Sequence, residues 1–286
     1  QCAIIASAMF GSINGSAPAN VASTGILTIP MMRRAGYSGR FAGGVEATAY
    51  CVGQIMPPVM GVGAFIMSDV TGIPYITIMF AAIIPAMLYL FSLSITVSLE
   101  ASRLKLDPLA NETPKWDRKM ISRAALLIIG FGSLLTMLFS GFPATFSGLV
   151  ASCIILVLAM VLPDTRLNYQ KWFTLAVDSG RDGLSVLLSC AAIGIVIAAI
   201  TSTGLGIKLN QEITALGDQN LLAALILAAL CSIVLGMGLP TAASYLMVIF
   251  VAGPAIMELG VSKLSTHLFV FYYAVLSAIT PPVALA

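Results

Sequence analysis

Long runs without a charged residue dominate the hydrophobic and polar pattern of this chain. Seven such runs lack Asp, Glu, Lys and Arg: residues 1–32, 47–68, 73–99, 124–163, 183–207, 219–257 and 268–286. Each run reaches the length of roughly 18–20 residues with which an α-helix spans a bilayer. The pattern therefore predicts an all-α polytopic membrane protein.

The lengths of the runs predict individual helices. Residues 73–99 suit one long helix with a kink at Pro85. The run 124–163 is too long for one span and divides into two at its SGFP sequence, whereas 183–207 makes one span. The amphipathic segment 168–183 is expected to lie along the membrane interface as a separate element.

Two runs are interrupted near their middle by small and turn-forming residues, at 11–20 and at 236–241. The halves beside the second break, 221–236 and 241–257, would form helices of only about 24–26 Å at 1.5 Å per residue. The hydrocarbon core of a bilayer is about 30 Å thick. Each run is therefore predicted to form a re-entrant helical hairpin rather than two full spans.

The composition and the charges agree with a membrane protein. The chain is 59% hydrophobic and 9% charged, against roughly 25% charged residues in a soluble domain. Its net charge of +2 does not indicate a nucleic-acid partner, and its five cysteines lack metal-binding or disulfide spacing. No signal-peptide pattern precedes the first apolar run, and we expect the chain to be a piece of a longer permease.

Basic residues are distributed unequally between the two sides of the predicted membrane. If the loop after the first hairpin is cytoplasmic, the loops 100–123 and 164–182 lie on the same side. These three loops hold 12 of the 14 Lys and Arg residues, and only Lys208 and Lys263 lie on the other side. This excess agrees with the positive-inside rule.

An internal repeat relates the two ends of the chain. An ungapped shift of 224 residues pairs Pro30 with Pro254, and the double proline 57–58 with the double proline 281–282. The first double proline interrupts a span, because proline lacks a backbone N–H and clashes with the preceding turn. Five predicted crossings separate the two hairpins, so they should enter from opposite faces. Two inverted units of hairpin plus broken helix are typical of secondary transporters.

The broken helices should offer backbone carbonyls to a cation. In an α-helix the N–H of residue i bonds the carbonyl of residue i−4. The first double proline should therefore free the carbonyls of Gly53 and Gln54, and the second those of Ser277 and Ala278. Unwound carbonyls inside a membrane are a recurrent ligand for sodium in transporters.

The hairpin tips add side-chain oxygens and helix N-termini. Tip residues that supply oxygens or let the backbone turn are Ser12, Asn14 and Ser16 in the first hairpin, and Gly236, Gly238, Thr241 and Ser244 in the second. A helix should begin near Pro18 and another near Pro240, where free N–H groups attract anions. Sodium-coupled uptake of a carboxylate is the function that this combination predicts.

Two ionisable residues leave alternatives open. Glu46 lies about two turns inside its span and close to Arg33 and Arg40, which favours a structural ion pair over a functional carboxylate. His267 begins the last span beside Lys263, which favours an interfacial position over a proton relay.

Several sequence motifs of this chain also resemble those of a known family. The sequence GSINGSAPANVASTGILTIPMMRRAGYSGRFAGGVEATAYCVGQIMPPVMGVGAFIM (11–67) is similar to the large membrane subunit of tripartite ATP-independent periplasmic (TRAP) transporters. GMGLPTAASYLMVIFVAGPAIMELGV and SAITPPVALA resemble the second half of that subunit, which is called DctM. The sequence GQIMPPVMGVGAFIM most resembles the TAXI branch of this family, in which the small and large membrane subunits are often fused.

The resemblance implies a mechanism and a set of sites. One sodium site would lie between residues 12–16 and 53–57, including Pro57, and the other between 236–241 and 277–281, including Thr280. The substrate would lie near Asn20, Ser23, Thr24 and Ser244. In an elevator mechanism, residues 1–68 and 208–286 would form the moving transport domain, and residues 69–207 the scaffold.

The resemblance also implies partners and a location. We expect a multi-pass protein of the bacterial inner membrane that imports an organic acid with a periplasmic substrate-binding protein and a small membrane subunit. No cofactor is expected beyond sodium as the coupling ion. The alternative is a stand-alone sodium–carboxylate symporter of the same superfamily that needs no binding protein. An intramembrane enzyme is not favoured, because the chain has no HExxH motif and no paired membrane aspartates.

Overall fold

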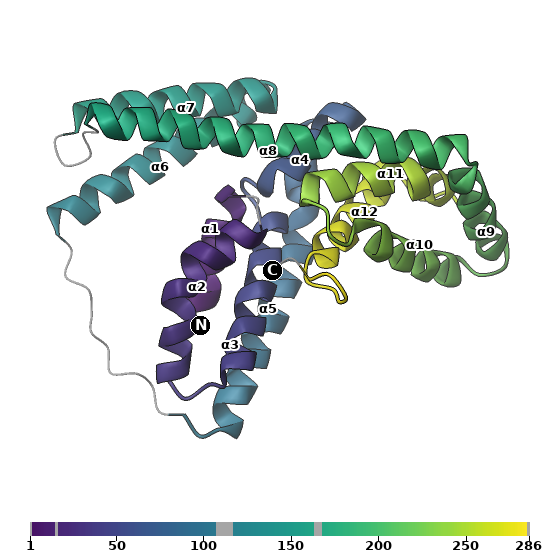
Figure 1. Ribbon diagram of the computed structural model, residues 1–286, viewed down its shortest axis with the longest axis horizontal. Coiled ribbons are helices and arrows are strands. Elements are labelled where there is room, and N and C mark those ends of the chain that lie inside the picture. Colours follow the sequence, from purple (N-terminus) through teal and green to yellow (C-terminus); the bar gives the residue numbers. More distant parts are fainter. Residues whose placement is uncertain (1, 15–16, 107–116, 163–167, 285–286) are drawn as a thin grey trace. The chain divides into compact units, whose positions relative to one another are not determined.

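The structure is a computed structural model that describes residues 2–14, 17–106, 117–162 and 168–284. Its described part is helical and contains no β-strand (Figure 1). Five of its helices are long and apolar enough to cross a membrane. The predicted all-α membrane fold is therefore confirmed.

The chain forms two compact units, which are described separately. One unit comprises residues 1–73, 78–108 and 186–286, and the other residues 74–77 and 109–185. The helices are α1 (Cys2–Asn14), α2 (Ala17–Arg34), α3 (Gly39–Ile55), α4 (Gly61–Thr71), α5 (Tyr75–Arg103), α6 (Arg118–Phe139), α7 (Ala144–Val161), α8 (Tyr169–Ser202), α9 (Leu205–Gln219), α10 (Leu221–Gly236), α11 (Thr241–Glu258) and α12 (Lys263–Ser277).

Most predicted boundaries agree with these helices, and one is wrong. The helix α5 is continuous and contains Pro85, and the SGFP sequence separates α6 from α7. The segment 168–183 is not separate from the following helix, because α8 runs without a break for 34 residues, about 51 Å at 1.5 Å per residue; its expected position at the membrane interface stays a prediction. No proline interrupts α8, so nothing in its backbone stops the helix where its composition changes. The helix α9 was not predicted.

The smaller unit contains α6, α7 and the beginning of α8. The helices α6 and α7 pack closely, and a Cβ atom added at Gly130 would lie 2.5 Å from the Ile155 side chain. Both helices keep large apolar side chains exposed, including Ile128 of α6 and Leu149 of α7. Such apolar exterior surfaces suit contact with lipid.

In the larger unit, the 224-residue shift relates local structure as well as sequence. It superimposes the bounds of α2 on those of α11, and the first residue of α3 on the first residue of α12. Ser38 caps the N-terminus of α3 and Ser262 that of α12, each by accepting a backbone N–H with its hydroxyl. Equivalent backbone angles lie in the left-handed region, with φ of 104° at Gly36 and 85° at Gly260.

The breaks after the two helices also correspond. The helix α3 ends at Ile55 and α12 ends at Ser277, and a cis peptide bond joins the two prolines in both breaks. Met60, with φ of 55°, and Ala284, with φ of 38°, are equivalent under the same shift. Each half of the larger unit therefore consists of two helices joined at a tip, followed by a third helix that a double proline ends.

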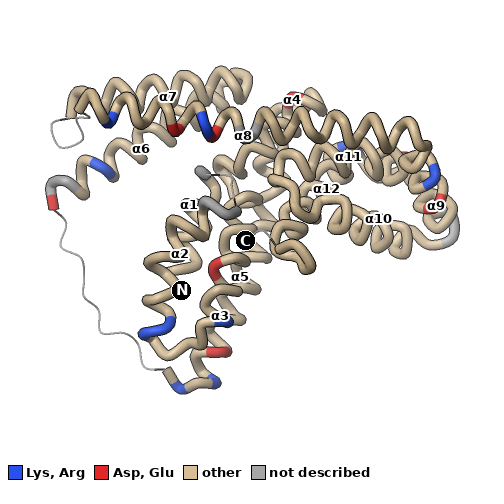
Figure 2. Tube along the Cα trace, in the orientation of Figure 1, with Lys and Arg blue, Asp and Glu red and all other residues tan. Residues whose placement is uncertain are grey.

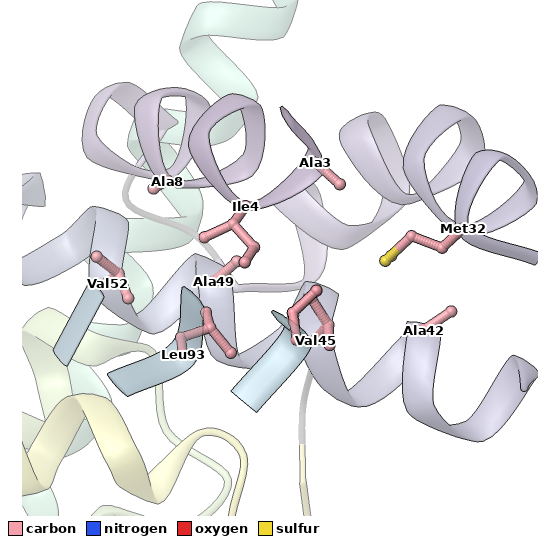
Figure 3. Packing of buried hydrophobic residues seen from close by; sticks show 10 residues of the cluster. Ala3, Ile4, Ala8, Met32, Ala42, Val45, Ala49, Val52 and Leu93 are labelled. Carbon is pink, nitrogen blue, oxygen red and sulfur yellow. The ribbon is translucent and has the colours of Figure 1, made fainter. Parts of the chain in front are cut away.

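The core of the first half lies between α1 and α3 (Figure 3). Small and branched residues of the two helices interdigitate, with Met32 of α2 and Leu93 and Val97 of α5 at the edges: Ala3, Ile4 and Ala8 from α1, and Ala42, Val45, Ala49 and Val52 from α3. Alanines at these contacts let the two backbones approach closely, as small residues do in membrane helices.

Basic residues gather at one end of α2, α3 and α5 (Figure 2). Arg33 and Arg34 occupy the last turn of α2, and Arg103 the last turn of α5. A Cβ atom added at Gly36 would lie 2.6 Å from the Leu106 side chain, so the α2–α3 turn and the residues after α5 are neighbours. The α2–α3 turn and the described start of the loop after α5, which the positive-inside rule places on one side, lie at the same end of these helices.

Candidate functional site

The tip of the first hairpin and the first break are joined by a close backbone contact. A Cβ atom at Gly53 would lie 2.5 Å from the Ala8 carbonyl oxygen and 2.8 Å from Gly11 Cα. A Cβ atom at Gly11 would lie 3.2 Å from the Tyr50 carbonyl oxygen and 3.4 Å from the Asn20 amide nitrogen. Two glycines thus let α1, α2 and α3 bring backbone and side-chain polar atoms together.

A buried polar network lies beside this contact. The Asn20 amide is fully buried and donates to the Ser7 hydroxyl at 3.0 Å. The Thr24 hydroxyl donates to the Asn20 carbonyl at 2.9 Å. Ser12 instead donates to the Met9 carbonyl of its own helix at 2.8 Å, and Ser23 is exposed.

These contacts bring together some of the residues predicted from the sequence. Asn20 and Thr24 share one network, and Ser12 lies on the neighbouring helix turn. The side chain of Asn14 and the whole of Ser16 lie outside the described residues.

The second hairpin and the second break meet in the equivalent place. Ser244 and Ser277 place their hydroxyl oxygens 3.4 Å apart, and both are buried. A Cβ atom at Gly236 would clash with the Ser244 hydroxyl and would lie 2.6 Å from the Ser277 hydroxyl. The 224-residue shift relates Ser244 and Ser277 to Asn20 and Gly53. In the first half the tip residue that lies close to these two positions is Gly11, next to Ser12, the equivalent of Gly236.

The remaining predicted residues of the second site lie around this cluster. Gly238 has a φ of 79°, a left-handed turn that favours glycine. The Thr280 hydroxyl donates to the Leu276 carbonyl at 2.8 Å. Thr241 is the first residue of α11 and is buried.

One predicted free carbonyl is wrong. The Ser277 carbonyl accepts the Thr280 N–H at 3.2 Å, and the Ala278 N–H returns to the Val275 carbonyl at 3.3 Å. These are the tight i→i+3 bonds with which many helices end. The final turn of α12 therefore engages the Ser277 carbonyl, although the double proline cannot. Cation binding by Gly53, Gln54, Pro57 and Ala278 stays a prediction.

A tyrosine that the sequence analysis did not select joins the two halves. Tyr50 of α3 is fully buried, its hydroxyl accepts the Gln54 amide, and it lies beside the Thr241 side chain of α11. Its place one turn before the first break was the signal available in the sequence. This tyrosine contacts two predicted site residues that lie in different repeats.

The two proline-ended helices also meet directly. The Cys51 thiol of α3 lies 3.8 Å from the Val275 carbonyl of α12 and donates to it. Cys51 and Val275 are equivalent under the 224-residue shift. A residue that contacts its own equivalent marks the place where two repeats cross, just before both breaks.

The structure corrects the expectation for Glu46 and shows the surroundings of His267. Glu46 makes no ion pair with an arginine in the described part of the chain. Its carboxylate instead accepts hydrogen bonds from the hydroxyl groups of Thr24 and Thr28. His267 is only 4% exposed, and its Nδ1 lies 2.7 Å from the Tyr245 hydroxyl. It is therefore packed against other side chains, and its expected position at the membrane interface stays a prediction.

Comparison with known proteins gives a consistent result. The family model described as "Tripartite ATP-independent periplasmic transporter, DctM component" matches residues 1–286. The chain is 23% identical over 287 residues to the C4-dicarboxylate TRAP transporter large permease protein DctM of Pseudomonas aeruginosa, covering 99% of this chain and 66% of the relative.

Two further relatives are similar over the same extent. The 2,3-diketo-L-gulonate TRAP transporter large permease protein YiaN of Escherichia coli is 26% identical over 285 residues, covering 98% of this chain and 65% of the relative. The sialic acid TRAP transporter large permease protein SiaM of Vibrio cholerae is 24% identical, covering 99% of this chain and 66% of the relative. The chain thus spans slightly less than two thirds of the length of these curated relatives.

Proposed function

We propose that this chain, which belongs to the DctM-component family of tripartite ATP-independent periplasmic transporters, imports an organic acid by coupling its uptake to sodium. The family is one of transporter permeases and not of enzymes, as the sequence predicted. The predicted location in the bacterial inner membrane agrees with the family and with the five apolar helices long enough to span a bilayer.

The observation that carries the proposal is the duplicated unit of hairpin and proline-ended helix. Both copies bring a tip residue, a residue of the second hairpin helix and a residue just before the break into contact. Such duplicated, interrupted helices serve as ion and substrate sites in secondary transporters. In a lipid environment, irregular backbone is tolerated only where protein or a polar cavity satisfies it.

The donor atoms at the two sites suit a hard monovalent cation. The second cluster offers the hydroxyl oxygens of Ser244 and Ser277 beside Gly236, where the absence of a side chain lets both hydroxyls approach the backbone. Oxygen ligands of this kind favour hard cations over soft metals. The first site would use backbone oxygens near Gly53 together with the tip at residues 12–16. Sodium, when bound, supplies positive charge that favours an anionic substrate nearby.

The beginning of α11 supports an anionic substrate. Pro240 precedes this helix, and no side chain caps its first turn. The first backbone N–H groups of a helix have no intrahelical partner and attract carboxylates. The substrates printed in the names of the three relatives, a C4-dicarboxylate, 2,3-diketo-L-gulonate and sialic acid, are all organic acids. A carboxylate held near Ser244 and the α11 N-terminus is the arrangement that we propose.

We further propose that the permease moves its substrate by an elevator mechanism. The two hairpins and proline-ended helices, residues 1–68 and 208–286, would move together, because Tyr50 and Cys51 of the first repeat contact residues of the second repeat. Residues 69–207 would form the scaffold. The partners would be a periplasmic substrate-binding protein and a small membrane subunit, which in TAXI-type permeases is often fused to the large one.

Uptake into proteoliposomes tests this function. The complete permease with its small subunit would be reconstituted, and labelled organic acids would be offered with and without a sodium gradient and the cognate binding protein. We expect uptake only when sodium and the binding protein are both present. Sodium-dependent uptake without a binding protein would instead support the stand-alone symporter.

A further inference from the structure

The first repeat contains a buried carboxylate that the proposed sodium sites do not use. Glu46 lies in the middle of α3 and is 0% exposed. Thr24 and Thr28, one turn apart on α2, each form a hydrogen bond from the hydroxyl group to one carboxylate oxygen of Glu46. The distance from Thr28 Oγ1 to Glu46 Oε2 is 2.5 Å. Gly25 lies between the two threonines, and a Cβ there would be 3.5 Å from Glu46 Cγ. The carboxyl group is thus enclosed by one face of α2.

Among the described residues, no Lys or Arg forms an ion pair with this carboxylate, and Arg34 at the end of α2 is exposed. The helix α1 contains no ionisable Asp, Glu, Lys, Arg or His. On α2, Arg33 lies against Gly39, almost two turns before Glu46, and Arg40 of α3 lines the surface that faces α5. An uncompensated carboxylate buried in a membrane is costly.

The titratable groups on the other neighbouring helices have partners of their own or lie elsewhere. Tyr89 of α5 lines the surface between α3 and α5 together with Arg40. Lys263 of α12 donates to the Thr71 carbonyl at 2.8 Å, and His267 bonds Tyr245. Asp69 of α4 is exposed. The hydrogen bonds of the Glu46 oxygens in the described structure come from the two threonines.

The second repeat shows that packing does not require the triad of Thr24, Thr28 and Glu46. Under the 224-residue shift, Thr24, Thr28 and Glu46 become Val248, Ala252 and Val270. All three of these apolar residues are 0% exposed, in helices with the same starting positions. The same packed position is therefore filled without any polar group in one repeat. A carboxyl triad in the other repeat has a role beyond holding the helices together.

The triad can satisfy both charge states of the carboxyl group. The Thr24 hydroxyl lies 2.9 Å from the Asn20 carbonyl, and the Thr28 hydroxyl lies 3.0 Å from the Thr24 carbonyl. When Glu46 is ionised, both hydroxyls donate to it. When Glu46 carries a proton, its O–H donates to one threonine oxygen, and that hydroxyl turns to the backbone carbonyl. No buried polar group is left without a partner in either state.

We propose that Glu46 is a proton-binding site that gains and loses one proton during the transport cycle. The proton comes from water, bonds to one carboxyl oxygen and returns to water on release, so the only change is between carboxylate and carboxylic acid. A proton suits the triad, because each carboxylate oxygen lies within hydrogen-bond distance of one threonine hydroxyl, whichever partner carries the hydrogen. The site would also sense the substrate site, since Thr24 bonds Asn20. This inference rests on the proposed function only for the role of the proton in transport.

Infrared difference spectroscopy tests proton binding without requiring transport. The complete permease in lipid would be titrated with pH while the C=O stretch of protonated carboxyl groups is followed. We expect a band that disappears as pH rises and that is absent from Glu46→Gln. Glu258→Gln is the matched control, because Glu258 is an exposed carboxylate near the end of a hairpin helix, and it should retain the band. Identical pH difference spectra for wild type and Glu46→Gln would overturn the proposal.

Uptake measurements test the role of the proton. With a constant sodium gradient, wild-type uptake should vary with pH, by at most about tenfold per pH unit for one proton, whereas Glu46→Gln should lose this dependence. Glu46→Val, which introduces the residue of the second repeat, should also lose it and controls for folding of the glutamine variant. A pH dependence that persists in both folded variants would refute the transport role. Failure of all uptake would contradict the proposed function and leave the infrared result to decide on the proton site.

Discussion

The close contact between α1 and α3 predicts opposite effects for two glycine-to-alanine substitutions in one helix. In Gly53→Ala the new methyl group would lie 2.5 Å from the Ala8 carbonyl oxygen and 2.8 Å from Gly11 Cα. Both neighbours are backbone atoms, which cannot turn aside as a side-chain end can. The α1 backbone would have to retreat by about 0.6–0.9 Å to restore ordinary contact, and overpacking of this kind costs about 1–3 kcal/mol.

The control is Gly43→Ala in the same helix. A Cβ atom at Gly43 would meet no atom within 4 Å, so the substitution adds no clash. Alanine favours a helix over glycine by about 0.8–1 kcal/mol. We therefore expect Gly53→Ala to lower the free energy of unfolding and Gly43→Ala to raise it or leave it unchanged.

Thermal unfolding of the complete permease in detergent measures both variants. A loss of about 1–3 kcal/mol corresponds to a decrease in Tm of roughly 2–5 °C for a chain of 286 residues. Gly53→Ala should also weaken sodium activation of uptake, because the retreat of α1 separates the hairpin tip from the break. A Tm for Gly53→Ala equal to or above that of Gly43→Ala would refute the packing argument, whatever the effect on transport.

Two further variants test the site, one of them with a matched control. Pro57→Ala combined with Pro58→Ala should let α3 continue as a helix and weaken sodium activation of uptake; unchanged activation would contradict a carbonyl site at this break. Tyr50→Phe removes the hydroxyl that bonds Gln54 and lies beside Thr241 and should destabilise the permease by about 1–3 kcal/mol, as expected when buried polar partners lose their bond. Tyr169→Phe, at a position 81% exposed, is its control and should change the free energy of unfolding by less than about 0.5 kcal/mol. Equal Tm values for the two tyrosine variants would argue against the connection between the repeats.

Local features of the chain determined much of what could be predicted. The membrane class follows from runs of uncharged residues, since a charge is costly in hydrocarbon wherever the helix around it packs. The hairpins and breaks follow from glycine and proline, which act on their own backbone within about one turn. For the same reason, the 224-residue shift located both copies of the unit, and the bounds of α2 and α11 agree with it to the residue.

The errors concern properties that are not local. Nothing in the amphipathic composition of residues 168–183 could show that α8 continues through them, because continuity depends on the absence of a stop and not on hydropathy. The expected Glu46–arginine ion pair was inferred from nearness in sequence. The rotation of α3 about its axis instead turns Glu46 toward Thr24 and Thr28.

The sequence by itself therefore determined that this is a membrane protein with two hairpins, two double-proline breaks and a repeat that relates them. Only the tertiary structure decided which residues of the two repeats meet. Cys51 contacts Val275 and Tyr50 contacts Thr241 because α3 and α12 pack in one unit, and the contacts join positions about 190 or more residues apart. Such pairs depend on how helices are rotated and spaced, which helix period and composition leave undetermined.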